Sequence, residues 1–245
     1  MKIRGWQKVS TIDYPTHIAT VLFTSGCNFR CPMCHNADLV LRPETLPIFS
    51  KDSEDEVEAF LKERAGKITG VVITGGEPTL QPDLPSFLRR MHGYGYAVKL
   101  DTNGYRPEVL AKLLDAGLLD YVAMDVKAPS RTYNQLAGLR YVDTGRITKS
   151  IRLLLEADVV REFRTTVVPG MLNGQDIASI AQWIAENMKP YHEPPRYVLQ
   201  QFRPVNTLDP AMALREPYDA ASLRIMRNQA GKHLPISRIK IRGIQ

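Results

Sequence analysis

The sequence is poor in cysteine, and this scarcity limits what kind of protein it can encode. Only three of its 245 residues are cysteine, and Cys27, Cys31 and Cys34 all lie within eight residues of one another. Three cysteines cannot build the disulfide framework of a small secreted domain, and one disulfide would leave an odd thiol. Neither an apolar leader nor a cleavage site marks the basic first residues, so we expect no oxidising compartment.

Long apolar runs, internal repeats and low-complexity tracts are also missing. No stretch approaches the roughly 20 apolar residues that cross a bilayer, so we expect a cytoplasmic chain without a membrane partner. The formal net charge is +6, but the basic residues are scattered and form no compact motif with aromatic residues. We therefore expect no nucleic-acid partner, and a solvated surface or an acidic protein partner explains the charge better.

The three cysteines form the most informative feature that is present. Thiolates this close in sequence can bind three irons of a cubane iron–sulfur cluster, which leaves the fourth iron open to a small molecule. Structural zinc is a minor alternative, because it usually takes four ligands and His35 follows Cys34 too directly to complete the same tetrahedron. Unligated buried cysteines would be expected to scatter along the chain rather than share one loop.

Apolar β-rich runs alternate with amphipathic segments along the chain. The pattern predicts strands over 17–24, 68–74, 97–100, 121–126, 163–168 and 197–202, and helices over 53–64, 83–92, 107–116, 147–156, 176–188 and 218–230. Such alternation predicts an α/β fold, a partial (β/α)6 barrel of parallel strands of the TIM type, with a doubly wound open sheet as the competing architecture. Without a convincing linker, we expect one domain over 1–245. Its core would span about 16–205, between a short N-terminal lead-in and a C-terminal extension of helix and strand.

Polar residues follow three of the predicted strands directly. These runs are Gly75-Gly76-Glu77-Pro78, Asp101-Thr102-Asn103-Gly104 and Asp125-Val126-Lys127. The carboxyl ends of parallel strands are where such folds bind ligands. A glycine pair lets backbone approach a ligand, and a neighbouring carboxylate can receive an ammonium group or a ribose hydroxyl. The simpler alternatives are a tight turn with a solvated Glu77 and an Asn-Gly turn after Asp101.

These motifs resemble a known family. The spacing Cys27-x-x-x-Cys31-x-x-Cys34 with the later Gly-Gly-Glu-Pro resembles the radical S-adenosylmethionine (SAM) superfamily. The runs Cys34-His35-Asn36, 101–104, 125–127 and 164–170 resemble the activating enzymes of glycyl-radical enzymes, which include the pyruvate formate-lyase activating enzyme. The opening run Ser10-Thr11-Ile12-Asp13-Tyr14-Pro15 resembles the branch that activates anaerobic ribonucleotide reductase.

The resemblance implies an activity and a set of partners. In the family the three cysteines hold one [4Fe-4S] cluster, SAM binds its open iron, and one-electron reduction yields methionine and a 5′-deoxyadenosyl radical. In the activating branch this radical takes hydrogen from a glycine of a partner enzyme, here expected to be anaerobic ribonucleotide reductase. A flavodoxin- or ferredoxin-type protein would donate the electron. The cofactors carry the chemistry, so no side chain is expected to act as a general acid or base.

The resemblance also assigns roles to individual residues. Gly76 and Glu77 would contact the methionine amino group, Lys127 and Arg164 would meet carboxylate or ribose oxygens, and His35 and Asn36 would line the adenine. Including strand-end neighbours, the expected cofactor-binding set is Met33, His35, Asn36, Gly75, Gly76, Glu77, Asp101, Asn103, Asp125, Lys127 and Arg164. Met33 departs from the aromatic residue that is usual in the family. Gln200 or Gln201 is placed where the sixth strand should meet the ligand.

The family comparison further suggests a monovalent cation site formed by Asp101, Thr102 and Asp125. Hard oxygen ligands suit such an ion, and turn capping or strand-end salt bridges are the alternative roles for the two aspartates. Two other functions stay open from the sequence. One is a small-molecule radical SAM enzyme such as 7-carboxy-7-deazaguanine synthase, and the other is a non-catalytic zinc-binding interaction module.

Overall fold

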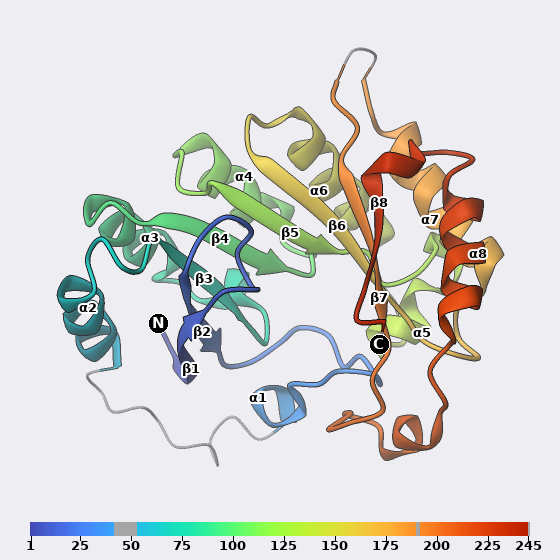
Figure 1. Ribbon diagram of the computed structural model, residues 1–245, viewed down its shortest axis with the longest axis horizontal. Coiled ribbons are helices and arrows are strands. Elements are labelled where there is room, and N and C mark those ends of the chain that lie inside the picture. The colour runs from blue at the N-terminus through green and yellow to red at the C-terminus, as the bar shows by residue number, and fades with distance from the viewer. Residues whose placement is uncertain (42–52, 190–191, 245) are drawn as a thin grey trace. The chain divides into compact units, whose positions relative to one another are not determined.

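The computed structural model describes residues 1–41, 53–189 and 192–244 and divides into two compact units (Figure 1). The first unit comprises Met1–Asn28, Asn36–Thr102 and Glu108–Val122. The second comprises Phe29–His35, Asn103–Pro107 and Ala123–Gln245. Cys27 therefore belongs to the first unit, and Cys31 and Cys34 to the second.

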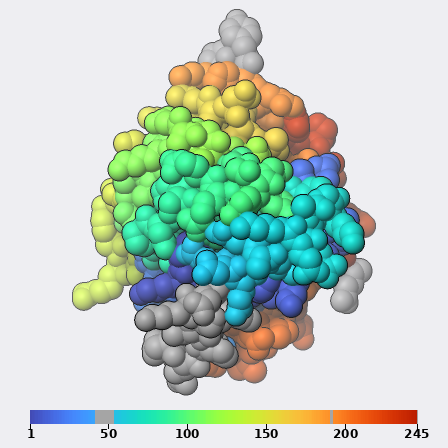
Figure 2. All heavy atoms as spheres, turned by 90° about the vertical axis from the view of Figure 1, so that its left-hand side faces the viewer, coloured from blue at the N-terminus to red at the C-terminus, as the bar shows by residue number. Residues whose placement is uncertain are grey.

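The first unit is built on four strands. β1 (Ile3–Ser10) pairs antiparallel with β2 (Ala19–Thr24), while β2, β3 (Gly70–Gly75) and β4 (Ala97–Thr102) are parallel neighbours. Its helices are α1 (Ala37–Leu41), α2 (Ser53–Glu63), α3 (Leu84–Gly93) and most of α4 (Pro107–Asp115). Figure 2 faces the side on which α2 lies, shown in cyan. Strands β2 and β3 are nearly continuous apolar runs because both of their faces are covered.

The second unit holds three parallel strands in the order β6 (Val160–Val167), β7 (Arg196–Gln201) and β8 (Ile239–Arg242). Strand β5 (Tyr121–Asp125) begins in the first unit and ends in the second. The helices are α5 (Tyr133–Ala137), α6 (Thr144–Glu156), α7 (Gly174–Glu186) and α8 (Ala220–Ala230). Helix α7 begins with an Asn173–Asp176 capping box, which satisfies its first amide groups, and it lies beside α8 (Figure 1).

Each predicted strand and helix is present, with shifted ends. Helix α6 begins at Thr144 rather than 147 because the Asp143 side chain caps it, accepting from the amide of Gly145. The expected lead-in contains β1, a strand that the sequence pattern did not predict. The single-domain assignment over 1–245 stays a prediction. None of the helices in the described parts of the chain is long and apolar enough to cross a membrane.

A buried ion pair fastens β8 to β6. The Glu162 side chain is only 1% exposed, and both of its carboxylate oxygens lie 3.1 Å from one terminal nitrogen of Arg242. A second guanidinium, that of Arg196, lies 3.8 Å away. Arginine thus compensates a carboxylate that would otherwise be costly to bury.

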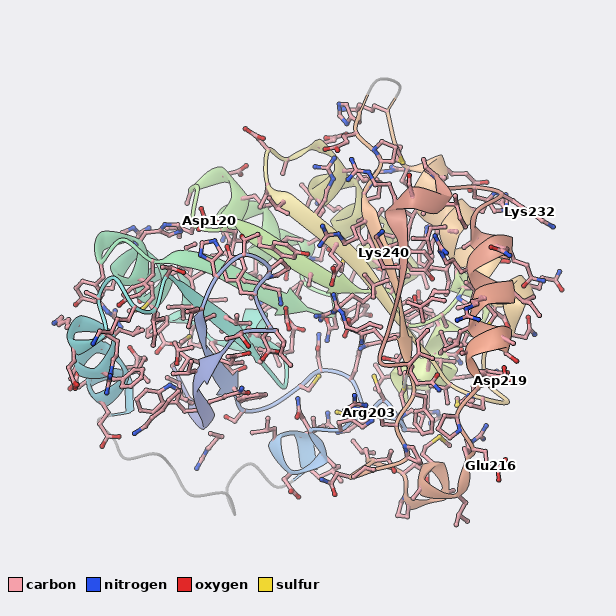
Figure 3. All side chains as sticks on the ribbon, in the orientation of Figure 1. Asp120, Arg203, Glu216, Asp219, Lys232 and Lys240 are labelled. Carbon is pink, nitrogen blue, oxygen red and sulfur yellow. The ribbon has the colours of Figure 1, made fainter. Side chains whose placement is uncertain are left out.

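We expect Arg242→Ala to lower the free energy of unfolding by about 1 kcal/mol, because half of the Arg242 side chain is in solvent and Arg196 stays in place. Urea unfolding measures the change. Lys240→Ala on the same strand is the control, since Lys240 is exposed (Figure 3) and makes no salt bridge with any residue that the structure describes. Equal stability of the two variants would show that the pair contributes nothing.

Candidate functional site

Cys27 follows β2 directly, in a turn fixed by backbone hydrogen bonds. Gly26 adopts the left-handed conformation, with φ +83°, and its amide donates to the carbonyl of Leu39 at 2.8 Å. The Cys27 thiol lies 3.8 Å from the side-chain oxygen of Asn28. All three cysteines are free thiols. The first cysteine is therefore placed by the end of a buried strand, as the sequence predicts.

Cys31 and Cys34 share one turn in the second unit. The amide of Cys34 donates to the carbonyl of Cys31 at 3.0 Å, and the amide of Arg30 donates to Ala137 at the end of α5 at 2.8 Å. Burial raises the pKa of the Cys31 thiol to about 11, and the nearby Lys127 ammonium opposes this shift. Metal coordination deprotonates a thiol outright. By itself, the Cys31 side chain is therefore a protonated thiol at neutral pH. Bound to a positively charged cluster iron, it would be a thiolate.

The segment after β7 is hydrogen-bonded to this same turn. The His35 ring donates through Nε2 to the carbonyl of Arg203 at 2.8 Å, because a carbonyl can only accept. The amide of Asp209 donates to the carbonyl of Pro32 at 2.9 Å. Met33 is buried, with 5% of its surface exposed. His35 thus anchors the cysteine turn, and its expected contact with adenine stays a prediction.

The glycine pair after β3 meets the backbone after β2 at very short range. Gly75 has φ +113°, and a Cβ atom on Gly76 would lie 2.0 Å from the carbonyl oxygen of Gly26. That oxygen also accepts the amide of Glu77 at 2.8 Å. The Asn36 side-chain amide donates to the carbonyl of Gly75 at 3.0 Å. Only glycine fits at position 76, and Asn36 supports the turn from the α1 side.

Glu77 is a buried carboxylate. It is 1% exposed, and its Oε1 accepts from the amide and hydroxyl of Thr79, at 3.1 and 2.5 Å, and from the hydroxyl of Thr102 at 2.7 Å. The alternative of a tight turn with a solvated Glu77 is therefore wrong. The sequence could not show this burial, because it depends on Thr102, a residue 25 positions away.

The polar residues after β4 divide into an ion pair and a turn. In the first unit, the ammonium of Lys99 lies 2.6 Å from Oδ1 of Asp101, and only 5% of the Lys99 side chain is exposed. In the second unit, the Asn103 side chain accepts the amide of Tyr105 at 2.9 Å, and Gly104 has φ +71°. The Asn-Gly turn is present. A cation at Asp101 would compete with Lys99, so that site stays a prediction.

Three charged side chains converge after β5. Asp125 receives Lys127 Nζ at 2.7 Å on one oxygen and Arg164 Nε at 2.8 Å on the other. Burial opposes ionisation of the carboxyl, but the two cations prevail and hold the Asp125 pKa well below its usual range. Burial likewise disfavours the Lys127 ammonium, yet Asp125 raises the Lys127 pKa above normal. The strand-end salt bridge considered for Asp125 is thus present, and it fixes two cationic groups at one place.

The two glutamines of β7 differ in their contacts. The Gln201 side chain donates to the carbonyl of Tyr218 at 2.5 Å, whereas Gln200 lies 3.5 Å from the hydroxyl of Thr166 and 3.4 Å from Arg242. Neither contact decides which glutamine meets a ligand.

Within residues 1–41, 53–189 and 192–244, no three His, Cys, Asp or Glu side chains lie close enough to bind a single metal ion.

The chain is similar to several known proteins. A family model described as "Radical SAM superfamily" matches residues 21–184. A Methanocaldococcus jannaschii protein named "Putative glycyl-radical enzyme activating enzyme MJ1227" is 36% identical over 214 residues, which are 84% of this chain and 82% of that protein. The 7-carboxy-7-deazaguanine synthase of Thermococcus kodakarensis is 29% identical over 182 residues, 67% of this chain and 68% of the enzyme.

A solved structure supports the fold. Streptococcus suis SuiB, crystallised with its precursor peptide SuiA, matches with a TM-score of 0.64 at 18% identity, over 91% of this chain and 48% of SuiB. The chain thus spans about half the length of SuiB, and identity this low bears on the fold alone. The α/β fold with its mostly parallel sheet, predicted as a partial (β/α)6 barrel, is confirmed.

Proposed function

Because the chain belongs to the radical SAM superfamily, we propose that this enzyme installs a glycyl radical on a partner protein. The 36% identity to the M. jannaschii protein, across most of both chains, carries this proposal. The sequence motif Cys34-His35-Asn36 supports it, since this run resembles the activating branch. The partner that we propose is an anaerobic ribonucleotide reductase, on the resemblance of the run from Ser10 to Pro15.

The cofactors of the enzyme are a [4Fe-4S] cluster and SAM, as in its superfamily. The residues present fit both groups. Cys27, Cys31 and Cys34 are free thiols and would bind three irons. Gly75 and Gly76 let the turn after β3 pack directly against the backbone after β2. This turn lies at the carboxyl end of a parallel strand, where such sheets bind ligands.

The charged residues after β5 suit the anionic and polar parts of SAM. Lys127 and Arg164 are held by Asp125, with only 17% and 11% of their side chains exposed, so their charges are poorly screened by solvent. We assign them the carboxylate or ribose oxygens of SAM. The buried Glu77 fixes the turn that carries Gly76, and the backbone of this turn would receive the methionine amino group.

When bound and reduced, the cluster supplies the electron that cleaves SAM to methionine and a 5′-deoxyadenosyl radical, which takes a hydrogen atom from the partner's glycine. A flavodoxin- or ferredoxin-type protein would deliver that electron. The side chains orient SAM and exclude water, and none has to move a proton. The monovalent cation site at Asp101, Thr102 and Asp125 is part of this proposal, with Lys99 and Lys127 as the groups that an ion would have to displace.

Anaerobic reconstitution followed by electron paramagnetic resonance tests the function. We expect about four irons per chain, release of 5′-deoxyadenosine on reduction with SAM, and a glycyl doublet when the partner reductase is added. A partner in which the radical-bearing glycine is replaced by alanine is the control, and it should give no doublet. Stoichiometric zinc without SAM cleavage would contradict the proposal outright.

The similarity to the T. kodakarensis enzyme supports a second candidate, a radical SAM enzyme that acts on a small molecule. The same experiment separates the two. If the reduced protein cleaves SAM but gives no doublet with any candidate glycyl-radical enzyme, the small-molecule function is favoured.

A further inference from the structure

An apolar pocket of about 440 Å³ lies within the first unit, away from the residues discussed so far. Its lining residues are Lys8, Val9, Ile18, Phe60, Arg64, Lys67 and Ile68. They come from the end of β1, the residue before β2, helix α2 and the segment that leads into β3. Figure 2 faces the side of the molecule that carries α2.

The pocket lies at the amino ends of parallel strands. Ile18 directly precedes β2, and Ile68 precedes β3, whereas Cys27 and Gly76 follow the carboxyl ends of those two strands. Ligands of parallel sheets, including the cofactors proposed above, bind at the carboxyl ends. This pocket is therefore separate from the proposed SAM site, by the length of one strand.

The interior of the pocket is apolar and partly open. Ile68 is buried, with 3% exposure, and Phe60 packs edge-on against Trp6, with ring centroids 5.1 Å apart. Val9 and Ile18 are 52% and 45% exposed, although large aliphatic side chains usually gain by burial. A pocket of this volume falls in the range of about 300–1,000 Å³ that holds small molecules.

Three of the seven residues that line this pocket are cationic, namely Lys8, Arg64 and Lys67. The Lys8 ammonium lies 5.4 Å from the Trp6 ring and 5.8 Å from the Phe60 ring, and the Arg64 guanidinium lies 5.8 Å from Phe60. Arg64 has one acidic neighbour, Glu63, at 3.5 Å. Among the described residues, Lys8 and Lys67 have no carboxylate within salt-bridge distance. The rim therefore carries uncompensated positive charge beside exposed apolar surface.

We propose that this pocket binds a small amphipathic anion, with an apolar body in contact with Phe60, Ile18 and Ile68 and a carboxylate between Lys8 and Lys67. The residues that line the pocket account for both parts of this ligand, the apolar body and the carboxylate. An uncharged apolar molecule would leave the two ammonium groups without an anionic partner, and a compact polar anion would leave Val9 and Ile18 in water. Each ionic contact at such an exposed rim contributes modestly, so affinity would come from the two parts together.

Decanoate is a suitable probe, and Trp6 is a built-in reporter because it contacts Phe60. The chain has two tryptophans, so Trp183→Phe leaves Trp6 as the only indole. In that background we expect decanoate to change the Trp6 emission saturably below its micellar concentration. Decanol has the same alkyl chain and no charge. It should bind about tenfold more weakly, a difference of roughly 1.4 kcal/mol in binding free energy.

The double variant Lys8→Gln/Lys67→Gln should reduce decanoate affinity about tenfold and remove its preference over decanol. Lys62→Gln/Lys112→Gln is the matched control, because both lysines are exposed in the same unit and outside the pocket. Thermal unfolding verifies that both doubles are folded. Equal binding of decanol and decanoate, equal loss in both double variants, or no saturable binding of decanoate would each overturn the proposal.

Discussion

Gly76→Ala is expected to lower the free energy of unfolding by about 1–3 kcal/mol and to reduce iron incorporation sharply. The added Cβ would lie 2.0 Å from the carbonyl oxygen of Gly26 and 2.6 Å from its carbon. Gly26 cannot easily move away, because its amide donates to Leu39 and its carbonyl accepts from Glu77. Any shift of Gly26 is passed to Cys27, the next residue. A change of one methyl group after β3 should therefore disturb a cluster ligand that follows β2.

Gly93→Ala is the matched control. Gly93 ends α3, and a Cβ atom there would meet no atom within 4 Å. Alanine at such a helical position should be neutral or stabilising by up to about 1 kcal/mol. Chemical denaturation and iron analysis after anaerobic reconstitution measure both variants. If Gly76→Ala matched Gly93→Ala in stability and iron content, the close approach at Gly26 would not constrain the site.

Asp125→Asn is expected to lower the free energy of unfolding by roughly 3 kcal/mol at neutral pH. The substitution keeps the shape of the side chain but removes the charge that compensates Lys127 and Arg164. Both cations are largely buried, so they would lose the carboxylate between them and repel each other. We also expect SAM to bind more weakly, because the two groups would no longer be held in place. Urea unfolding and equilibrium dialysis with SAM measure the two effects.

The acid limb of the stability profile gives an independent test of the same carboxylate. Asp125 has a folded pKa well below its unfolded value near 3.8. Its contribution is therefore fully present above pH 4 and is lost as the pH falls through the folded pKa. The wild-type protein should lose this stability below pH 4, whereas Asp125→Asn should show a flatter decline there. Asp158→Asn, an exposed aspartate in the same unit, should leave the wild-type profile unchanged.

The sequence predicted the strands and helices of the parallel part of the fold because apolar β-rich runs alternate there with amphipathic segments. It missed β1, whose residues are mostly half-buried or exposed and include Arg4, Gln7 and Lys8. An edge strand of this kind carries no clear apolar alternation. Strand β8 lies in the predicted C-terminal extension of helix and strand, whose bounds the sequence did not give.

The sequence could predict which residues form the candidate site, but not which of them contact one another. The sequence placed Asp125, Lys127 and Arg164 at strand ends, yet their shared ion pair depends on β6, which brings Arg164 to a residue 39 positions earlier. Thr79 and Lys99 were not predicted, although they bind Glu77 and Asp101. Their signal was local, since each lies two residues from its carboxylate.

The ion pair between Glu162 and Arg242 also has a consequence for how the protein is made. Its members are 80 residues apart, and a ribosome adds roughly 5–20 residues per second. Synthesis of the chain from Glu162 to Arg242 therefore takes roughly 4–16 s. Once β7 has been synthesised, its edge that later pairs with β8 stays open for the rest of that interval, and exposed strand edges can pair with other chains. Slowing synthesis between these two residues should therefore increase aggregation of the nascent chain.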